Sequence, residues 1–151
     1  MRLPTTLLPG RGFQQGTLTQ PAASGYAPRL TQVTIVNQTR GCLLGDRIER
    51  ADTGQTRRVG LLKRPGLEKG EGLWIVPSEA IHTFFMRFDI DVLFLDRQKR
   101  VVKAVSRLRP WRLAMSWRAR TILELPPGII EQTGTRAGDQ LEVVLQETPR
   151  S

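Results

Sequence analysis

Few side chains in this sequence could hold a metal ion or carry out a reaction. The chain contains one histidine, His82, and one cysteine, Cys42. His82 and Met86 are four residues apart, a spacing that places both side chains on one face of a strand or of a helix. An imidazole and a thioether suit a soft ion such as Cu(I), to which Cys42 could add a thiolate. Because a closed site is hard to assemble from so few ligands, we expect no bound metal and no cofactor.

Asp91 is the third residue of the candidate pocket, after His82 and Met86. In the apolar segment Ile90–Leu95 it shares a strand face with two leucines. A buried carboxylate without partners is costly, so Asp91 must be paired, hydrogen-bonded or at the edge of a pocket. Either Asp91 is paired for structural reasons, or it lines a small cleft with His82. The possible ionic partners are Arg64, Arg87 and His82.

A small hydrolase or soft-metal-handling protein that uses His82, Met86 and Asp91 is therefore one functional hypothesis. The sequence carries no G-x-S-x-G, no phosphate-binding G-x-x-x-x-G-K-[ST] and no H-E-x-x-H pattern. Hydrolysis by paired carboxylates would have to rely on Asp89 and Asp91, or on Glu124. No residue is assigned a catalytic role on this basis, and the sequence favours a protein that is not an enzyme.

Positive charge is concentrated in one segment of the chain. Nine basic residues and no acidic residue lie between Arg97 and Arg120, and the rest of the sequence is balanced, so this window holds the whole net charge of +9. Within it, the segment Arg107–Arg120 combines guanidinium groups, which match phosphate geometry, with indoles that can stack on bases. The candidate anion-binding residues are Arg107, Arg109, Trp111, Arg112, Trp117, Arg118 and Arg120.

This concentration of positive charge leads to the main hypothesis, a non-enzymatic binding or accessory module with an anionic partner. That partner could be single-stranded nucleic acid, a lipid surface or an acidic protein. Alternatively, the arginines reflect genomic base composition and either tryptophan caps the open end of the core. A third possibility, a structural subunit of a larger assembly, predicts a large exposed apolar patch and a stable oligomer. The sequence leaves the oligomeric state open.

Short strands separated by turn residues account for most of the chain. The sequence predicts a short helix from Asp52 to about Lys63 and one helical turn in Gly128–Gly134. The apolar segment Phe84–Leu95 is too long for one strand and is divided near Phe88. We therefore expect a mostly β fold, a single β-sandwich or small barrel-like domain with one or two short helices. Further strands are expected at Thr31–Val36, Leu43–Ile48, Leu73–Val76, Val101–Val105, Thr121–Leu125 and Gln140–Gln146.

The domain is expected to span residues 30–147. Residues 1–29, rich in proline and glycine, are expected to be a flexible leader, and residues 148–151 a tail. The chain contains no run of 18 apolar residues, so no transmembrane segment is expected. Because prolines interrupt Met1–Gly10, no secretory signal is expected either, and the expected location is cytoplasmic.

A series of short motifs along the domain resembles one known family. In this order they resemble the prokaryotic family named domain of unknown function 192, an uncharacterised family, from about Leu30 onward. The resemblance implies a compact, mostly β domain of the sandwich kind, often exported in relatives, and we expect a bacterial protein. It supplies no catalytic residues and leaves His82, Met86 and Asp91 as matched positions to test. The motifs are Gly60-Leu61-Leu62 with Arg64 and Leu67, Gly72–Val76, His82–Met86, Ile90–Asp96, Val101-Val102, Leu123–Gly128 and Gly138–Leu141.

Overall fold

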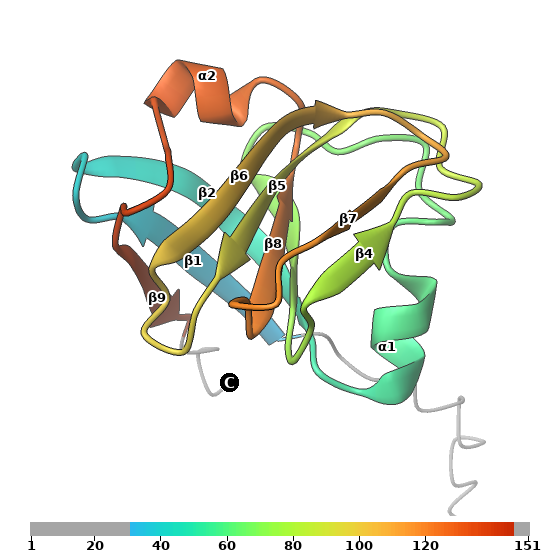
Figure 1. Ribbon diagram of the computed structural model, residues 1–151, viewed down its shortest axis with the longest axis horizontal. Helices are drawn as coiled ribbons and strands as arrows, with labels where there is room; N and C mark the ends of the chain where they lie inside the picture. The colour runs from blue at the N-terminus through green and yellow to red at the C-terminus, as the bar shows by residue number, and fades with distance from the viewer. Residues whose placement is uncertain (1–30, 147–151) are drawn as a thin grey trace, which may run out of the picture.

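Nine strands and two short helices follow one another along residues 31–146, the part of the chain that the computed structural model describes (Figure 1). This confirms the mostly β fold with two short helices. The expected leader and tail, with the outermost residues of the expected domain, lie outside the described residues. The elements are β1 (Thr31–Asn37), β2 (Cys42–Ala51), α1 (Gly54–Val59), β3 (Glu71–Ile75), β4 (Ala80–His82), β5 (Ile90–Leu95), β6 (Val101–Leu108), β7 (Leu113–Met115), β8 (Thr121–Leu125), α2 (Ile129–Thr133) and β9 (Leu141–Leu145).

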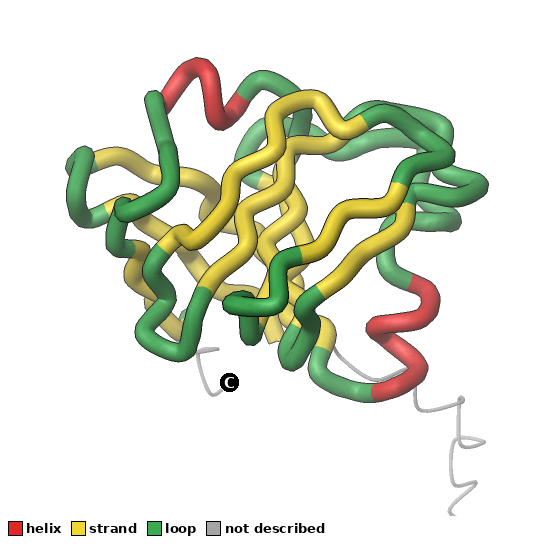
Figure 2. The backbone as a smooth tube through the Cα atoms, in the orientation of Figure 1, coloured by secondary structure: helices red, strands yellow, loops and turns green. Residues whose placement is uncertain are grey.

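Seven of the strands form one mixed sheet in the order β6-β5-β8-β3-β2-β1-β9. All neighbours are antiparallel except β2 and β3, which are parallel. The two outer strands approach each other at one end, where Arg100 and Gln140 form an isolated bridge and the Leu141 N–H donates to the Lys99 carbonyl at 3.0 Å. The sheet is therefore curled like part of a barrel (Figures 1 and 2), so the barrel-like alternative describes it.

The inner face of the curled sheet holds the first half of the core. Side chains from strands at both ends of the sheet meet there, among them Val33, Leu95 and Leu123. Helix α2 lies over one end of this face and adds Ile129 to the cluster (Figure 1). Because alternate residues of a strand point to opposite faces, Leu93 and Leu95 belong to this inner cluster, and their neighbours in β5 belong to the other.

The outer face of β3, β5 and β8 is covered by a second layer. This layer consists of the two-stranded sheet of β4 and β7 and of the segment around α1 (Figure 2). Ile81 and Ala114 point inward and are buried, whereas their neighbours Leu113 and Met115 point outward and are exposed. The small sheet therefore closes the core with one face and presents apolar side chains to solvent with the other.

Two local predictions from the sequence are wrong. The first half of Phe84–Leu95 is a loop after β4 and not a strand. Just before this loop, the Thr83 hydroxyl donates to the Arg109 carbonyl at 2.7 Å and accepts from the Arg112 N–H at 2.9 Å. The helix expected through Lys63 ends at Val59, where Gly60 follows with a φ of 44°. Strands β4 and β7, of three residues each, were not expected at all.

Candidate functional site

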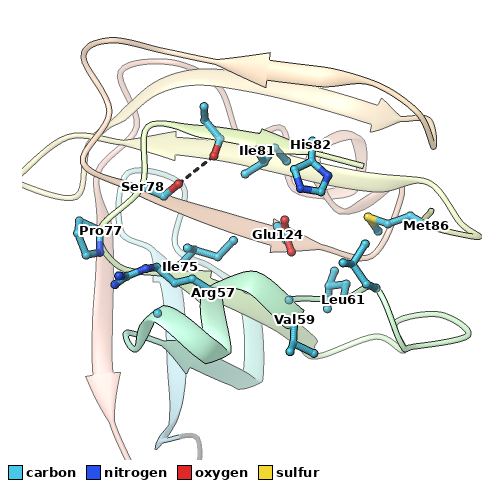
Figure 3. Close-up of a pocket in the computed structure, with 14 residues that line it drawn as sticks. Arg57, Val59, Leu61, Ile75, Pro77, Ser78, Ile81, His82, Met86 and Glu124 are labelled. Carbon is cyan, nitrogen blue, oxygen red and sulfur yellow. Dashed lines mark hydrogen bonds between the residues drawn. The ribbon is translucent and has the colours of Figure 1, made fainter. Parts of the chain in front are cut away.

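A cavity of about 420 Å³ lies between α1 and β4, with β3 and β8 beneath it (Figure 3). His82 and Met86 both line it, so the structure brings together the two residues that their spacing had paired. Met86 is buried, whereas His82 is exposed at the rim and stacks on Phe84 with ring centroids 5.1 Å apart. The remaining wall combines aliphatic side chains, among them Leu61 and Ile75, with polar ones.

Asp91 does not belong to this cavity, and its assignment to the candidate pocket was wrong. It is fully buried on the inner face of the sheet, because it alternates in β5 with residues of the outer cluster. Its Oδ1 accepts from the Arg107 N–H at 2.8 Å, and its Oδ2 accepts from the Ile130 N–H at 2.7 Å. The carboxylate therefore connects β6 to the first turn of α2. Of the two alternatives for Asp91, the structure shows the one in which it is paired for structural reasons, with backbone amides as partners.

Glu124 takes the place in the cavity that had been given to Asp91. It lies on β8 beside Val92 of β5, and its side chain is directed to the outer face (Figure 3). The residue is 5% exposed, and its Oε2 atom is buried without a hydrogen-bond partner among the described residues. Glu124 is the single acidic residue of the apolar strand TILEL, and this was the sequence signal that could have found it.

Burial raises the pKa of Glu124 to about 8, although the charge of Arg64 acts in the opposite direction. The Arg64 guanidinium donates to the Glu49 carboxylate, so it is already neutralised by a different group. Desolvation therefore dominates, and the Glu124 carboxyl is mostly protonated at neutral pH. In that form it can both donate and accept a hydrogen bond.

Two other polar side chains of the cavity have intramolecular partners. Nη1 of Arg57 donates to the carbonyl oxygens of Asp52 and Val76, each at 2.9 Å. The Ser78 hydroxyl donates to the Ala80 carbonyl at 2.9 Å. These bonds hold the walls of the cavity together. Among the described residues that line it, Glu124 is the one with a buried side-chain oxygen that has no hydrogen-bond partner.

The cavity lining contains one histidine and one acidic residue. Residues 31–146 contain no group of three or more histidine, cysteine or acidic side chains that could hold an ion. Cys42 begins β2 and is absent from the residues that line this cavity. The functional groups at the cavity are the Met86 thioether, the His82 imidazole and the Glu124 carboxyl.

The arginine and tryptophan segment lies on the surface of the molecule. The Trp111 side chain is 56% exposed and that of Trp117 is 78% exposed. Arg107 forms an ion pair with Glu131 at 3.6 Å. Within the described residues the other four arginines of the segment, all exposed, have no carboxylate within ion-pair distance. They are Arg109, Arg112, Arg118 and Arg120.

Large apolar side chains alternate along β7 and its flanks. Leu113 and Met115 are 71% and 60% exposed, and Trp111 and Trp117 continue the same spacing of two residues on either side. Phe85 is also exposed and lies against Trp111 with ring centroids 4.6 Å apart. We call these five residues the apolar stripe, and the stripe together with the four unpaired arginines the Trp/Arg surface.

The apolar stripe and the cavity are neighbours. The ring of Phe84 stacks on His82 at the cavity rim, and it is 5.9 Å from the Trp111 ring at the start of the stripe. His82 is also directly opposite Leu113 in the small sheet. The two features therefore share the β4–β7 layer, with the cavity beneath one edge and the stripe on its outward face.

No helix among residues 31–146 has the length and hydropathy needed to cross a membrane.

Comparisons with known proteins give a family without a named activity. A family model described as Uncharacterized ACR (DUF192) matches residues 35–143. A UPF0127 protein of Thermococcus sibiricus is 35% identical over 119 residues, which cover 75% of this chain and 76% of the relative. A UPF0127 protein of Pyrococcus abyssi is 35% identical over 115 residues, or 72% and 95% of the two chains. Both relatives are archaeal, so they do not support the expected bacterial source.

Two solved structures share the fold. A protein of unknown function from Novosphingobium aromaticivorans superposes with a TM-score of 0.65 at 22% identity, covering 75% of this chain and 84% of the other. A protein from Sinorhizobium meliloti also has a TM-score of 0.65, at 20% identity, covering 75% of this chain and 92% of the other. At these identities the likeness concerns the fold alone.

Proposed function

The chain belongs to the uncharacterised DUF192 family, and we propose a function for it on the basis of its own surface. It is a non-enzymatic module that binds reversibly to an anionic lipid surface through the Trp/Arg surface. The observation that carries the proposal is the exposed apolar stripe, bordered by arginines without carboxylate partners among the described residues. Such a combination is typical of proteins that lie on a membrane with aromatic side chains at the headgroup level.

The charge of the Trp/Arg surface supports an anionic partner. Its four unpaired arginines lie in the window that holds the whole net charge of the chain. Each basic residue near an anionic bilayer contributes about 1 kcal/mol of attraction, which salt weakens. Because none of these guanidinium groups has a carboxylate partner within residues 31–146, lipid phosphates would not have to displace one.

The apolar stripe favours lipid over nucleic acid. Exposed tryptophans would also stack on unpaired bases, but Leu113 and Met115 have no ring to stack and would contribute little to nucleic-acid binding. In a bilayer all five side chains of the stripe can leave water. Full burial of one large apolar side chain is worth about 1.5–3 kcal/mol, so partial insertion of a few of them adds substantially to the attraction of the arginines.

Vesicle sedimentation tests the proposal. We expect the protein to bind vesicles of phosphatidylcholine mixed with phosphatidylglycerol, to bind pure phosphatidylcholine weakly, and to dissociate as salt increases. Trp117→Ser should reduce binding, because it removes an exposed indole without touching the core. Leu145→Ser is the matched control, since Leu145 is 63% exposed but lies on β9, away from the stripe.

Three results would overturn this proposal. One is the absence of binding to the anionic vesicles. Another is tighter binding to a single-stranded oligonucleotide, which would reassign the Trp/Arg surface to nucleic acid. The third is a stable oligomer that Trp117→Ser dissociates, because the stripe would then be a contact between copies of the chain. A cytoplasmic location stays a prediction.

The alternative hypothesis of a hydrolase or soft-metal protein loses its basis in Asp91. That carboxylate lies on the opposite face of the sheet from His82 and Met86, with both oxygens accepting backbone N–H groups. The hypothesis stays a prediction that rests on His82 and Met86, which line the cavity together with Glu124.

A further inference from the structure

The cavity beneath β4 has a feature that the binding of a lipid surface does not use. Its floor carries the Glu124 carboxyl, buried and with one oxygen unpartnered among the described residues, while Arg57 and Ser78 have partners in the walls. We propose that this cavity binds a small, neutral, planar ligand that presents a hydrogen-bond acceptor next to a donor, as the amidine-like edge of adenine or cytosine does. This site is independent of the proposed function.

The hydrogen-bonding groups fit such an edge. A protonated carboxyl offers an O–H donor beside a carbonyl acceptor, and a ligand with a ring nitrogen beside an N–H group can pair with both. A buried polar atom without a partner costs about 1–3 kcal/mol. A ligand that supplies the missing partner therefore recovers this cost for Oε2 of Glu124, and a molecule without polar groups does not.

The walls fit a small ring. Leu61, Ile75 and Ile81 provide aliphatic surface on both sides of the carboxyl (Figure 3). The Met86 thioether and the His82 imidazole add two groups that make favourable contacts with aromatic rings. The volume of about 420 Å³ is at the small end of ligand sites, which suits a single heterocycle.

The surrounding charges disfavour a cationic ligand. The charged or titratable groups near Glu124 are Arg57 from α1, His82 from β4, and Arg64 with its partner Glu49. Arg57 would repel an ammonium or amidinium group, and the protonated carboxyl offers it no charge. The site therefore favours a ligand without a positive charge.

The experiment uses 9-methyladenine as the probe and follows its binding by NMR titration of the whole chain. We expect binding at pH 7 and about tenfold weaker binding at pH 9, where a carboxyl with a pKa of about 8 is mostly ionised. Glu124→Gln keeps a donor and an acceptor without ionising, so its affinity should be the same at both pH values. Glu124→Leu keeps the size of the side chain but should lose most of the affinity. The control probe, 9-methylpurine, lacks the amino donor and should bind at least tenfold more weakly.

Four outcomes would overturn the inference. They are no binding of 9-methyladenine, equal binding of 9-methylpurine, unchanged binding by Glu124→Leu, and affinity that increases with pH. The Glu124→Gln protein keeps the test decisive if the leucine variant does not fold. Vesicle binding by either variant should be unchanged, so the failure of this inference and the failure of the proposed function can be distinguished.

Discussion

Asp91 and Glu124 are buried on opposite faces of the same sheet, on neighbouring strands, and they are held in opposite ways. Asp91 faces inward, where each oxygen accepts a backbone N–H. Glu124 faces outward into a cavity and has an oxygen without a partner among the described residues, and its burial raises its pKa to about 8. Burial of an acidic residue therefore does not by itself identify a binding site, and our proposal for the cavity depends on the missing partner of Glu124.

The largest expected effect is the loss of stability on replacing Asp91. Asp91→Ala should lower the free energy of unfolding by about 3–5 kcal/mol, because two buried N–H groups lose a charged acceptor. Urea denaturation at pH 7 measures this change. An effect below about 1 kcal/mol would show that the inner carboxylate does not stabilise the connection between β6 and α2, and the contrast between the two acids would disappear.

Glu124→Leu should increase the free energy of unfolding at alkaline pH, whereas Asp91→Ala should lower it. The folded pKa of Glu124 is above its ordinary value, so its contribution to stability is fully present below about pH 4.5 and is lost as pH increases to about 8. A tenfold change in a protonation equilibrium between the folded and unfolded chain corresponds to about 1.4 kcal/mol. We therefore expect the leucine variant to equal or exceed the parent chain in stability at pH 8, by up to about 4 kcal/mol, as urea denaturation at that pH would measure. A leucine variant less stable than the parent chain at pH 8 would contradict this expectation.

The pH profile of unfolding extends the same comparison. The parent chain should lose part of its stability between pH 5 and pH 8, and Glu124→Gln should lose less over this range because its side chain does not ionise. Denaturation of both proteins across this range measures the difference. Identical profiles would mean that Glu124 is solvated in the folded protein.

The exposed residues should give the smallest changes in stability. Trp117→Ser should change the free energy of unfolding by no more than about 0.5 kcal/mol while it reduces vesicle binding, because the side chain is 78% exposed. Glu131→Gln breaks the exposed pair with Arg107 and should cost less than about 1 kcal/mol. A loss of several kcal/mol in either variant would assign the outer surface a structural role.

Much of the fold could be predicted from the sequence, because its longer strands have strong local signals. Segments such as Thr31–Val36 and Thr121–Leu125 are β-branched or apolar and end at turn residues, and the structure has strands there. Strands β4 and β7 have three residues each and depend on Thr83, which bonds to a loop nearly thirty residues away. No local pattern encodes a contact of that kind.

The candidate site could be predicted only in part. His82 and Met86 do line one cavity, but Met86 lies in the loop after β4, so the shared strand or helix face that their spacing implied is not the reason. The choice between Asp91 and Glu124 depended on which face of the sheet each strand turns to the cavity, and on whether backbone N–H groups come within reach. Both depend on the tertiary arrangement of α1, α2 and β4, which the sequence alone did not provide.

The most direct test is a pH titration of Glu124, followed through the ¹³C chemical shift of its side-chain carboxyl. It measures whether the acidic residue on the outer face of the sheet is neutral in the folded chain. Glu124→Gln identifies the resonance by its absence. We expect a midpoint at about pH 8 in the folded chain. A midpoint near the ordinary glutamate value of 4.5 would contradict the assignment, because the carboxyl would then be hydrated and charged, and the cavity would have no neutral donor to offer a ligand.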